Sequence, residues 1–197
     1  MAKEFIHTLL YLLGLHSART QTSAAERAAV ARHASGCKRL AEIGVFEGAT
    51  TRVIADNMHP EAEFHGIDPF FKGRIGVCWN EFIARREARW GKHGSNIKFF
   101  HGFSFDAAKS ISGDFDFIFI DGDHSLEGIT KDWKDWSVRV QPGAIIALHD
   151  SVVPDFDPHR GSLGSVQYYE SHIRHDDRFE VVEIVDSLAV LRRKQGA

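Results

Sequence analysis

The sequence predicts an α/β protein with a Rossmann-like, seven-stranded mixed sheet: five parallel strands, a C-terminal antiparallel hairpin, and helices on both faces. Three observations support this prediction. Short apolar runs alternate with helix-forming stretches, two of these runs are apolar almost throughout, and the last two are separated by only two residues. The alternation is typical of βαβ units with right-handed crossovers, whereas a two-residue connection permits a hairpin and no parallel crossover.

The parallel strands are expected in five apolar runs. In chain order they are residues 39–43, 63–67, 97–100, 115–120 and 144–148. The fourth and fifth runs, FDFIFI and AIIAL, are nearly continuous in apolar residues, as fully buried central strands are. Helices between the strands are expected to begin near Ala49, Asn80, Phe105 and Ser125. The runs at 179–185 and 188–193 form the predicted hairpin.

Residues 1–36 are expected to form a helical N-terminal extension, and residues 37–197 a single domain that contains the sheet. Ser23 precedes the helix-forming run AAERAAVARHA, and Glu26 stands three residues later, as in a capping box. Gly36 is expected to end this helix.

A shorter apolar segment, residues 5–15, comes first in the chain. It is interrupted by polar residues and is too short to span a bilayer. Its apolar side chains fall on one helical face, which favours a helix that docks on another surface. The residues of this face are Ile6, Leu9, Leu10 and Leu13. A homodimer formed through the N-terminal helices is therefore an expectation.

Composition excludes several classes of protein. The chain has 197 residues, 43% of them hydrophobic, which suits one compact domain. Its formal net charge of −3 argues against nucleic acid as a partner. Two cysteines, Cys37 and Cys78, make neither a disulfide framework nor a cysteine-based zinc site. A cytoplasmic protein without membrane association is the expectation.

A glycine-containing turn follows the first predicted strand, in the motif LAEIGVFEGATT. Its spacing, Glu42-x-Gly44-x-x-x-Gly48, differs from the Gly-x-Gly-x-x-Gly of dinucleotide-binding enzymes. Glycine lets the backbone approach a ligand, and the next helix offers free N–H groups. An acid at this point suits a cationic ligand such as S-adenosylmethionine (SAM) better than a pyrophosphate. A turn that needs glycine only for its shape is the alternative.

Polar residues also follow the second and third predicted strands. Asp68 ends the second strand, where a carboxylate can accept hydrogen bonds from both ribose hydroxyls of a nucleotide. The alternative is that Asp68 caps a helix. Gly102 and Ser104 follow the third strand and are expected on the adenine side, although Gly-x-Ser is also a common helix start.

Acids and histidines gather after the fourth and fifth predicted strands. Asp121, Asp123 and His124 follow FIFI, and His149 and Asp150 follow AIIAL. Neighbouring strands lie about 4.8 Å apart, so both clusters are expected to face one pocket. Carboxylates this close repel one another unless a cation intervenes, and oxygen ligands suit Mg²⁺, or Mn²⁺ if an imidazole is added. His124 suits proton removal from a hydroxyl near neutral pH. Helix capping or a structural histidine is the alternative.

These motifs together resemble the class I SAM-dependent methyltransferases. The closer resemblance is to the small metal-assisted O-methyltransferases, a group with macrolide-sugar methyltransferases and proteins close to cephalosporin hydroxylases. It covers residues 38–193 and rests on AEIGVFEG, GIDPF, FIFIDGDHSLEG and PGAIIALHD. The combination of IDGDH with a later LHD is the most specific part.

The resemblance implies roles for individual residues. Glu42, Gly44 and Gly48 would hold the methionine part of SAM, Asp68 the ribose, and Ser104 would lie near adenine. Catechol-type relatives have Asp-x-Asp-Lys after the fourth strand and Asp-Asn after the fifth. Asp121 and Asp150 match the metal-binding carboxylates, and His124 matches the lysine that assists deprotonation. Ser151 replaces the asparagine, so His149 is the candidate third metal ligand.

The predicted function is methyl transfer from SAM to the hydroxyl of a small-molecule acceptor, assisted by Mg²⁺ or Mn²⁺ on Asp121 and Asp150. Three alternatives remain open: a methyltransferase that works without a metal, an NAD-linked oxidoreductase on a doubly wound sheet, and a binding protein that retains the fold without catalysis. Residues 70–90 combine aromatic residues with Arg74, Arg85, Arg86 and Arg89. They form either an amphipathic helix with solvated arginines or a lid over the acceptor.

Overall fold

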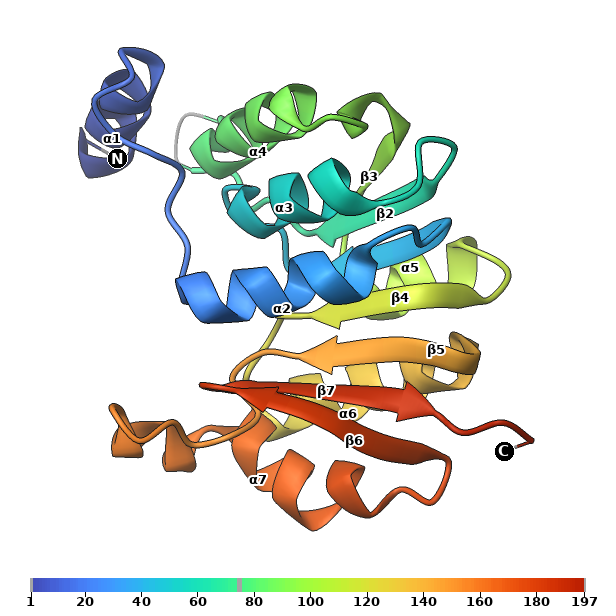
Figure 1. Ribbon diagram of the computed structural model, residues 1–197. Coiled ribbons are helices and arrows are strands. Elements are labelled where there is room, and N and C mark those ends of the chain that lie inside the picture. The colour runs from blue at the N-terminus through green and yellow to red at the C-terminus, as the bar shows by residue number, and fades with distance from the viewer. Residues whose placement is uncertain (1, 74–75, 197) are drawn as a thin grey trace.

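Seven strands form one sheet within residues 2–73 and 76–196, the part of the chain that a computed structural model describes (Figure 1). They are β1 (Arg39–Ile43), β2 (Glu63–Asp68), β3 (Ile97–His101), β4 (Phe115–Ile120), β5 (Val140–Leu148), β6 (Phe179–Val185) and β7 (Leu188–Arg193). The strand order is β3-β2-β1-β4-β5-β7-β6. Strands β1 to β5 pair in parallel, and β7 pairs antiparallel with both β5 and β6. The predicted fold class is confirmed.

Strand β5 begins four residues before the predicted start. Its pairing with β4 shifts register between Phe115 and Phe117, and Gly143 has a φ of +84°. A bulge in this pairing lets the strand continue through Pro142 and Gly143.

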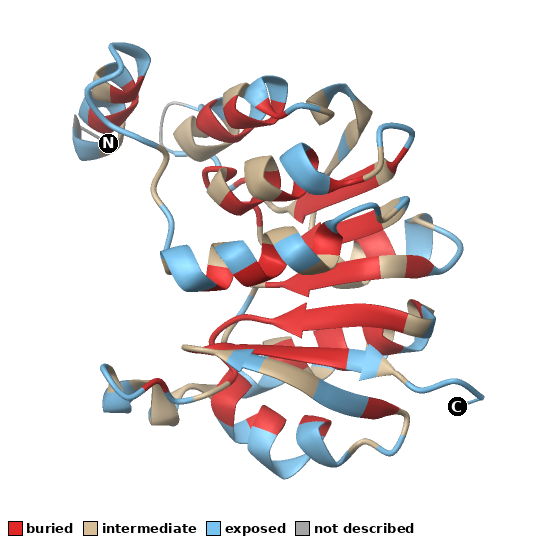
Figure 2. Cartoon of the chain, in the orientation of Figure 1, coloured by how far each residue is buried: buried red, intermediate tan, exposed pale blue. Residues whose placement is uncertain are grey.

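Helices cover both faces of the sheet (Figure 1). They are α1 (Ala2–Leu12), α2 (Ala24–Ala34), α3 (Ala49–Asn57), α4 (Trp79–Trp90), α5 (Ser104–Ser110), α6 (Leu126–Trp136) and α7 (Gly164–Ser171). Helices α2 and α3 share one buried core with the sheet, while α5, α6 and α7 share the core on the opposite face. The buried strands lie between these layers (Figure 2). Helix α7 was not among the predicted helices.

The N-terminal helix α1 lies beside α4 (Figure 1) and presents the opposite face to the one expected to dock. Ile6, Leu9 and Leu13 are exposed, whereas the inward side chains include His7 and Tyr11. The Tyr11 hydroxyl donates a hydrogen bond of 2.7 Å to the Glu87 carboxylate on α4. Polar contacts therefore attach α1 to the domain. The exposed leucine face keeps the homodimer as a prediction.

Helix α2 begins with the predicted capping box: the Glu26 backbone N–H donates to Ser23 Oγ, and the Ser23 N–H donates to Glu26 Oε2. Gly36 has a φ of +74° just beyond the helix end. None of the helices formed by the described residues has both the length and the apolar character needed to cross a membrane.

Candidate active site

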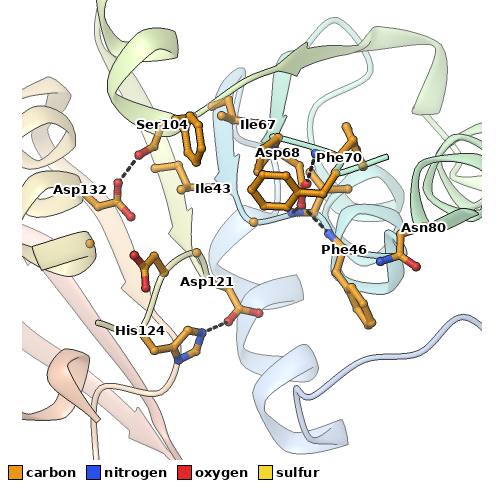
Figure 3. Close-up of a pocket in the computed structure, with 18 of the residues that line it drawn as sticks. Ile43, Phe46, Ile67, Asp68, Phe70, Asn80, Ser104, Asp121, His124 and Asp132 are labelled. Carbon is orange, nitrogen blue, oxygen red and sulfur yellow. Dashed lines mark hydrogen bonds and ion pairs between the residues drawn. The ribbon is translucent and has the colours of Figure 1, made fainter. Parts of the chain in front are cut away.

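A cavity of about 910 Å³ opens at the carboxyl ends of the parallel strands (Figure 3), where open α/β sheets bind ligands. Most residues predicted from the sequence for the site line it. These are Gly44, Asp68, Gly102, Ser104, Asp121, His124 and Asp150. Glu42, Gly48 and His149 lie behind its wall and do not line it.

The turn after β1 touches the turn after β4. Gly44 has a φ of +89°, and a Cβ at this position would overlap the backbone carbonyl of Asp121. The Asp121 N–H also donates to the Ile43 carbonyl at 2.7 Å. Glycine is therefore required here by both conformation and space, and the two turns form one continuous wall of the cavity.

Asp68 ties the end of β2 to the same glycine turn. Its Oδ2 accepts the backbone N–H groups of Val45 and Phe46, both at 3.0 Å, and its Oδ1 accepts the Phe70 N–H at 2.7 Å (Figure 3). No helix begins here, since α4 starts at Trp79, so Asp68 is not a helix cap. Its carboxylate lines the cavity, and the contact with ribose stays a prediction.

Glu42 is fully buried beneath the glycine turn. Thr51 donates a hydrogen bond of 2.5 Å to its Oε2, while its Oε1 has no hydrogen-bond partner among the described residues. Burial, together with the negative charges of Asp121 and Asp68, raises the pKa of Glu42 well above its ordinary value. This environment favours the protonated form of the side chain, which sits behind the wall, and direct contact with a cationic ligand stays a prediction.

Gly48 begins α3 and serves helix packing. Its φ is +80°, and a Cβ here would come within 2.8 Å of the Ala84 Cα on α4. The two residues that follow, Ala49 and Thr50, line the cavity with the first turn of α3. The residues after Gly48, and not Gly48 itself, therefore face the cavity.

His124 stands between the two predicted carboxylates at the edge of the cavity. Its Nδ1 lies 3.1 Å from Asp150 Oδ2. Its Nε2 lies 3.5 Å from Asp121 Oδ1, a contact that Figure 3 shows. Asp150 is buried, whereas the His124 side chain is about one quarter exposed, at 27%. A buried carboxylate at Nδ1 orients the ring and leaves Nε2 on the side of Asp121 and the cavity.

His149 lies behind the residues that line the cavity, and both of its ring nitrogens have carboxylate partners. Nδ1 is 2.9 Å from Asp121 Oδ1, and Nε2 is 3.2 Å from Glu26 Oε2. Burial alone would lower the pKa of His149, but the hydrogen bonds to Asp121 and Glu26 outweigh it and raise the pKa to about 9. Burial would likewise raise the pKa of Asp121, yet hydrogen bonds with His124 and His149 lower it.

Asp150 is held in a non-regular backbone conformation with a φ of +50°. The Ser187 hydroxyl donates to its Oδ1 at 3.0 Å, and the Arg160 guanidinium contacts the same oxygen. Non-glycine residues in this region of φ are uncommon and cluster at functional sites. Arg160 comes from the 3₁₀-helix η3 (Pro158–Ser162).

The donor set does not fit a divalent metal in this arrangement. His149 uses both ring nitrogens, and Asp150 is already paired with Arg160 and Ser187. A histidine ligand needs a free nitrogen lone pair, and a cation on Asp150 competes with a metal. Within residues 2–73 and 76–196, no three His, Cys, Asp or Glu side chains are grouped as metal ligands.

The N-terminal extension contributes directly to the site, which the sequence patterns did not indicate. Arg19 lines the cavity, and its backbone N–H and Nε donate to the fully buried Glu47 of the glycine turn, at 2.5 and 2.7 Å. His7 Nε2 lies 3.0 Å from the same carboxylate. Glu26 reaches His149 as described above. Long-range hydrogen bonds of this kind leave no periodic signal in the sequence.

The predicted lid is mostly an ordinary amphipathic helix. In α4, Ile83 and Ala84 are buried, and the Arg85 Nε donates to Glu81 at 2.7 Å one turn earlier. The described arginines of this segment do not line the cavity, whereas Cys78 and Asn80 do. Arg74 lies outside the described residues.

Asp132, on α6, is a cavity residue that the sequence patterns did not reveal. It is only 4% exposed, and Ser104 donates a hydrogen bond to its Oδ1 (Figure 3). Burial raises the pKa of Asp132 from an ordinary 3.8 to about 6. The only signal in the sequence is that Asp132 stands one helical turn before Trp136, on the apolar face of α6, where a carboxylate is unexpected.

The raised pKa of Asp132 predicts a pH-dependent cost to stability. Because the folded state binds the proton more tightly than the unfolded state, stability falls as pH rises from about 4 to above 6. Asp132→Asn is therefore expected to raise the free energy of unfolding by about 1–3 kcal/mol at pH 8 and to have little effect at pH 3.5. Urea denaturation at both pH values measures this difference. A variant that is less stable than the wild type at pH 8 would contradict the prediction.

The fold and the cavity define a class of protein. Class I methyltransferases are expected to have a parallel sheet into which one antiparallel strand is inserted, here β7. They also have a glycine turn after β1 and acidic residues after β2, β4 and β5, as in this chain. The sequence pattern of a family described as a methyltransferase domain matches residues 41–151. The chain belongs to this methyltransferase family, as the sequence motifs predicted.

Solved methyltransferase structures share the fold at low sequence identity. The O-methyltransferase from Bacillus cereus in complex with SAH is 17% identical, with a TM-score of 0.69 over 98% of this chain and 91% of that chain. TomG from Streptomyces achromogenes, an O-methyltransferase of tomaymycin synthesis in complex with SAM, is 16% identical, with a TM-score of 0.65 over 98% and 89%. Among curated proteins, the uncharacterized protein R132 of Acanthamoeba polyphaga mimivirus is 28% identical over 115 residues. The match covers 55% of this chain and about half, 49%, of R132.

Proposed function

We propose that this chain transfers the methyl group of SAM to the hydroxyl of a small-molecule acceptor. One observation supports O-methylation above all: His124 is oriented by the buried Asp150 and presents Nε2 beside Asp121 at the cavity. A base in this position can remove a hydroxyl proton. The SAM and SAH complexes of the similar O-methyltransferases agree with this reading.

The cavity wall fits SAM in its chemistry. Gly44 lets the turn after β1 pack directly against the backbone of Asp121, and the wall that these two turns form together lines the cavity. Asp68 retains lone pairs for ribose hydroxyls beyond its three backbone partners. The acids of the wall favour a ligand with cationic groups. When bound, SAM supplies a methyl group that its sulfonium has already activated.

The protein residues contribute proton transfer and positioning. Nε2 of His124 accepts the proton of the acceptor hydroxyl, and Asp150 stabilises the imidazolium that forms, through Nδ1. Asp121 lies on the opposite side of the ring, with its Oδ1 3.5 Å from Nε2. No step requires a divalent metal, because the predicted metal ligands already pair with His149, Arg160 and Ser187.

Calorimetric titration with SAH tests the cofactor part of the proposal. The wild type is expected to bind SAH, and Asp68→Ala to bind it at least about tenfold more weakly, because the ribose contact and the support of the glycine turn are both lost. Asp114→Ala is the matched control, since Asp114 is exposed and remote from the cavity lining. Near-ultraviolet circular dichroism checks that each variant is folded. No binding to the wild type at millimolar SAH would contradict SAM dependence.

A further inference from the structure

One end of the cavity has features that the proposed chemistry does not use. Asp132 is nearly fully buried, yet it lines the cavity beside Ser104 and Gly122. Its Oδ1 accepts the Ser104 hydroxyl, and its Oδ2 has no hydrogen-bond partner among the described residues. A Cβ on Gly122 would lie 3.3 Å from this Oδ2, so the absence of a side chain there leaves the oxygen accessible from the cavity.

The walls around Asp132 are apolar and partly aromatic. Ile43 and Ile67 lie near Ser104 on the strand side (Figure 3). Phe103 and Phe105 also line this end and stack with ring centroids 5.3 Å apart and an angle of 8° between the planes. Such surroundings suit a flat heteroaromatic ring, which gains apolar contact on its faces and meets a polar group only at its edge.

The charge at that edge determines which ring is accepted. A carboxylate accepts hydrogen bonds from an exocyclic amino group and repels a carbonyl oxygen in the same place. The nearby cation, Lys131, is bound to Glu127 at 2.6 Å and does not neutralise Asp132. Leaving a buried acceptor opposite a carbonyl is costly, which gives such sites strong selectivity.

We propose that Asp132 is a specificity-determining residue that selects a 6-aminopurine, accepting the amino N–H of the cofactor base at Oδ2. This inference rests on the proposed use of SAM. It moves base selection from the residues after β3, where the sequence motifs placed the adenine side, to a side chain of α6. Ser104, which follows β3, connects that region to α6: its hydroxyl holds Oδ1 of Asp132, which turns Oδ2 toward the cavity.

The test compares SAH with S-inosylhomocysteine, its analogue with a carbonyl in place of the 6-amino group. Calorimetry of the wild type is expected to show about 10- to 100-fold tighter binding of SAH. In Asp132→Asn the amide can donate to the carbonyl, so the preference is expected to shrink at least about tenfold. Asp135→Asn, on the same helix and outside the cavity lining, is the matched control and is expected to keep the wild-type preference.

The outcomes separate this inference from the proposed function. If the wild type binds neither compound, SAM dependence itself is wrong. If it binds SAH but shows no preference over the inosine analogue, or if Asp132→Asn keeps the full preference, Asp132 does not select the base and the proposed function stands. The wild-type comparison alone can overturn the inference, so the result does not depend on the folding of a variant.

Discussion

Replacing His124 with alanine is expected to lower kcat by about 10²- to 10⁴-fold while leaving the affinity for SAH within about threefold of the wild type. The imidazole is the proposed base, with Nε2 beside Asp121, and general base catalysis typically contributes a rate factor in this range. Single-turnover methyl transfer from radiolabelled SAM, with a panel of small hydroxyl compounds as acceptors, measures the rate. Calorimetry measures SAH binding separately.

Two controls accompany the His124 variant. His172→Ala removes an exposed imidazole that directly follows the C-terminal end of α7 and does not line the cavity, and it is expected to keep the wild-type rate. EDTA is expected to leave the wild-type rate unchanged, because the predicted metal ligands already have protein partners. A wild-type rate in His124→Ala, or a loss of activity in EDTA that Mg²⁺ restores, would contradict proton removal by His124 without a metal.

Replacing Gly44 with alanine is expected to destabilise the protein by more than about 4 kcal/mol and to abolish SAH binding. The φ of +89° disfavours any Cβ, and the added carbon would overlap the Asp121 carbonyl, which is backbone and cannot move without displacing β4. The turns after β1 and β4 would have to separate, and the cavity wall would open. Thermal and urea unfolding measure the loss of stability.

Gly36→Ala isolates the contribution of backbone conformation. Gly36 also has a positive φ, +74°, but no atom lies within 4 Å of where its Cβ would be. The Gly36→Ala substitution is therefore expected to lower the free energy of unfolding by only about 1 kcal/mol. If the two alanine variants proved equally stable, close contact between the two turns would not be what makes Gly44 necessary.

The local patterns of the chain were sufficient for the architecture. Alternating apolar runs located all seven strands within a few residues, because strand burial and helix amphipathicity leave periodic signals over short stretches. The two-residue link at Asp186 and Ser187 predicted the antiparallel end of the sheet, since no parallel crossover fits it. The glycine turn and the acids at strand ends predicted the site because parallel strands bring their carboxyl ends to one edge.

What the sequence determined by itself is therefore the sheet, the edge of the sheet at which the cavity opens, and the methyltransferase family. Only the tertiary structure decided how the polar groups pair: Glu26 with His149, Arg160 with Asp150, and Ser104 with Asp132. These partners stand between 10 and more than 100 positions apart, and hydrogen bonds over such separations depend on folded geometry. The physical reason is that apolar burial is periodic along the chain, whereas the pairing of buried charges is set by distance in space.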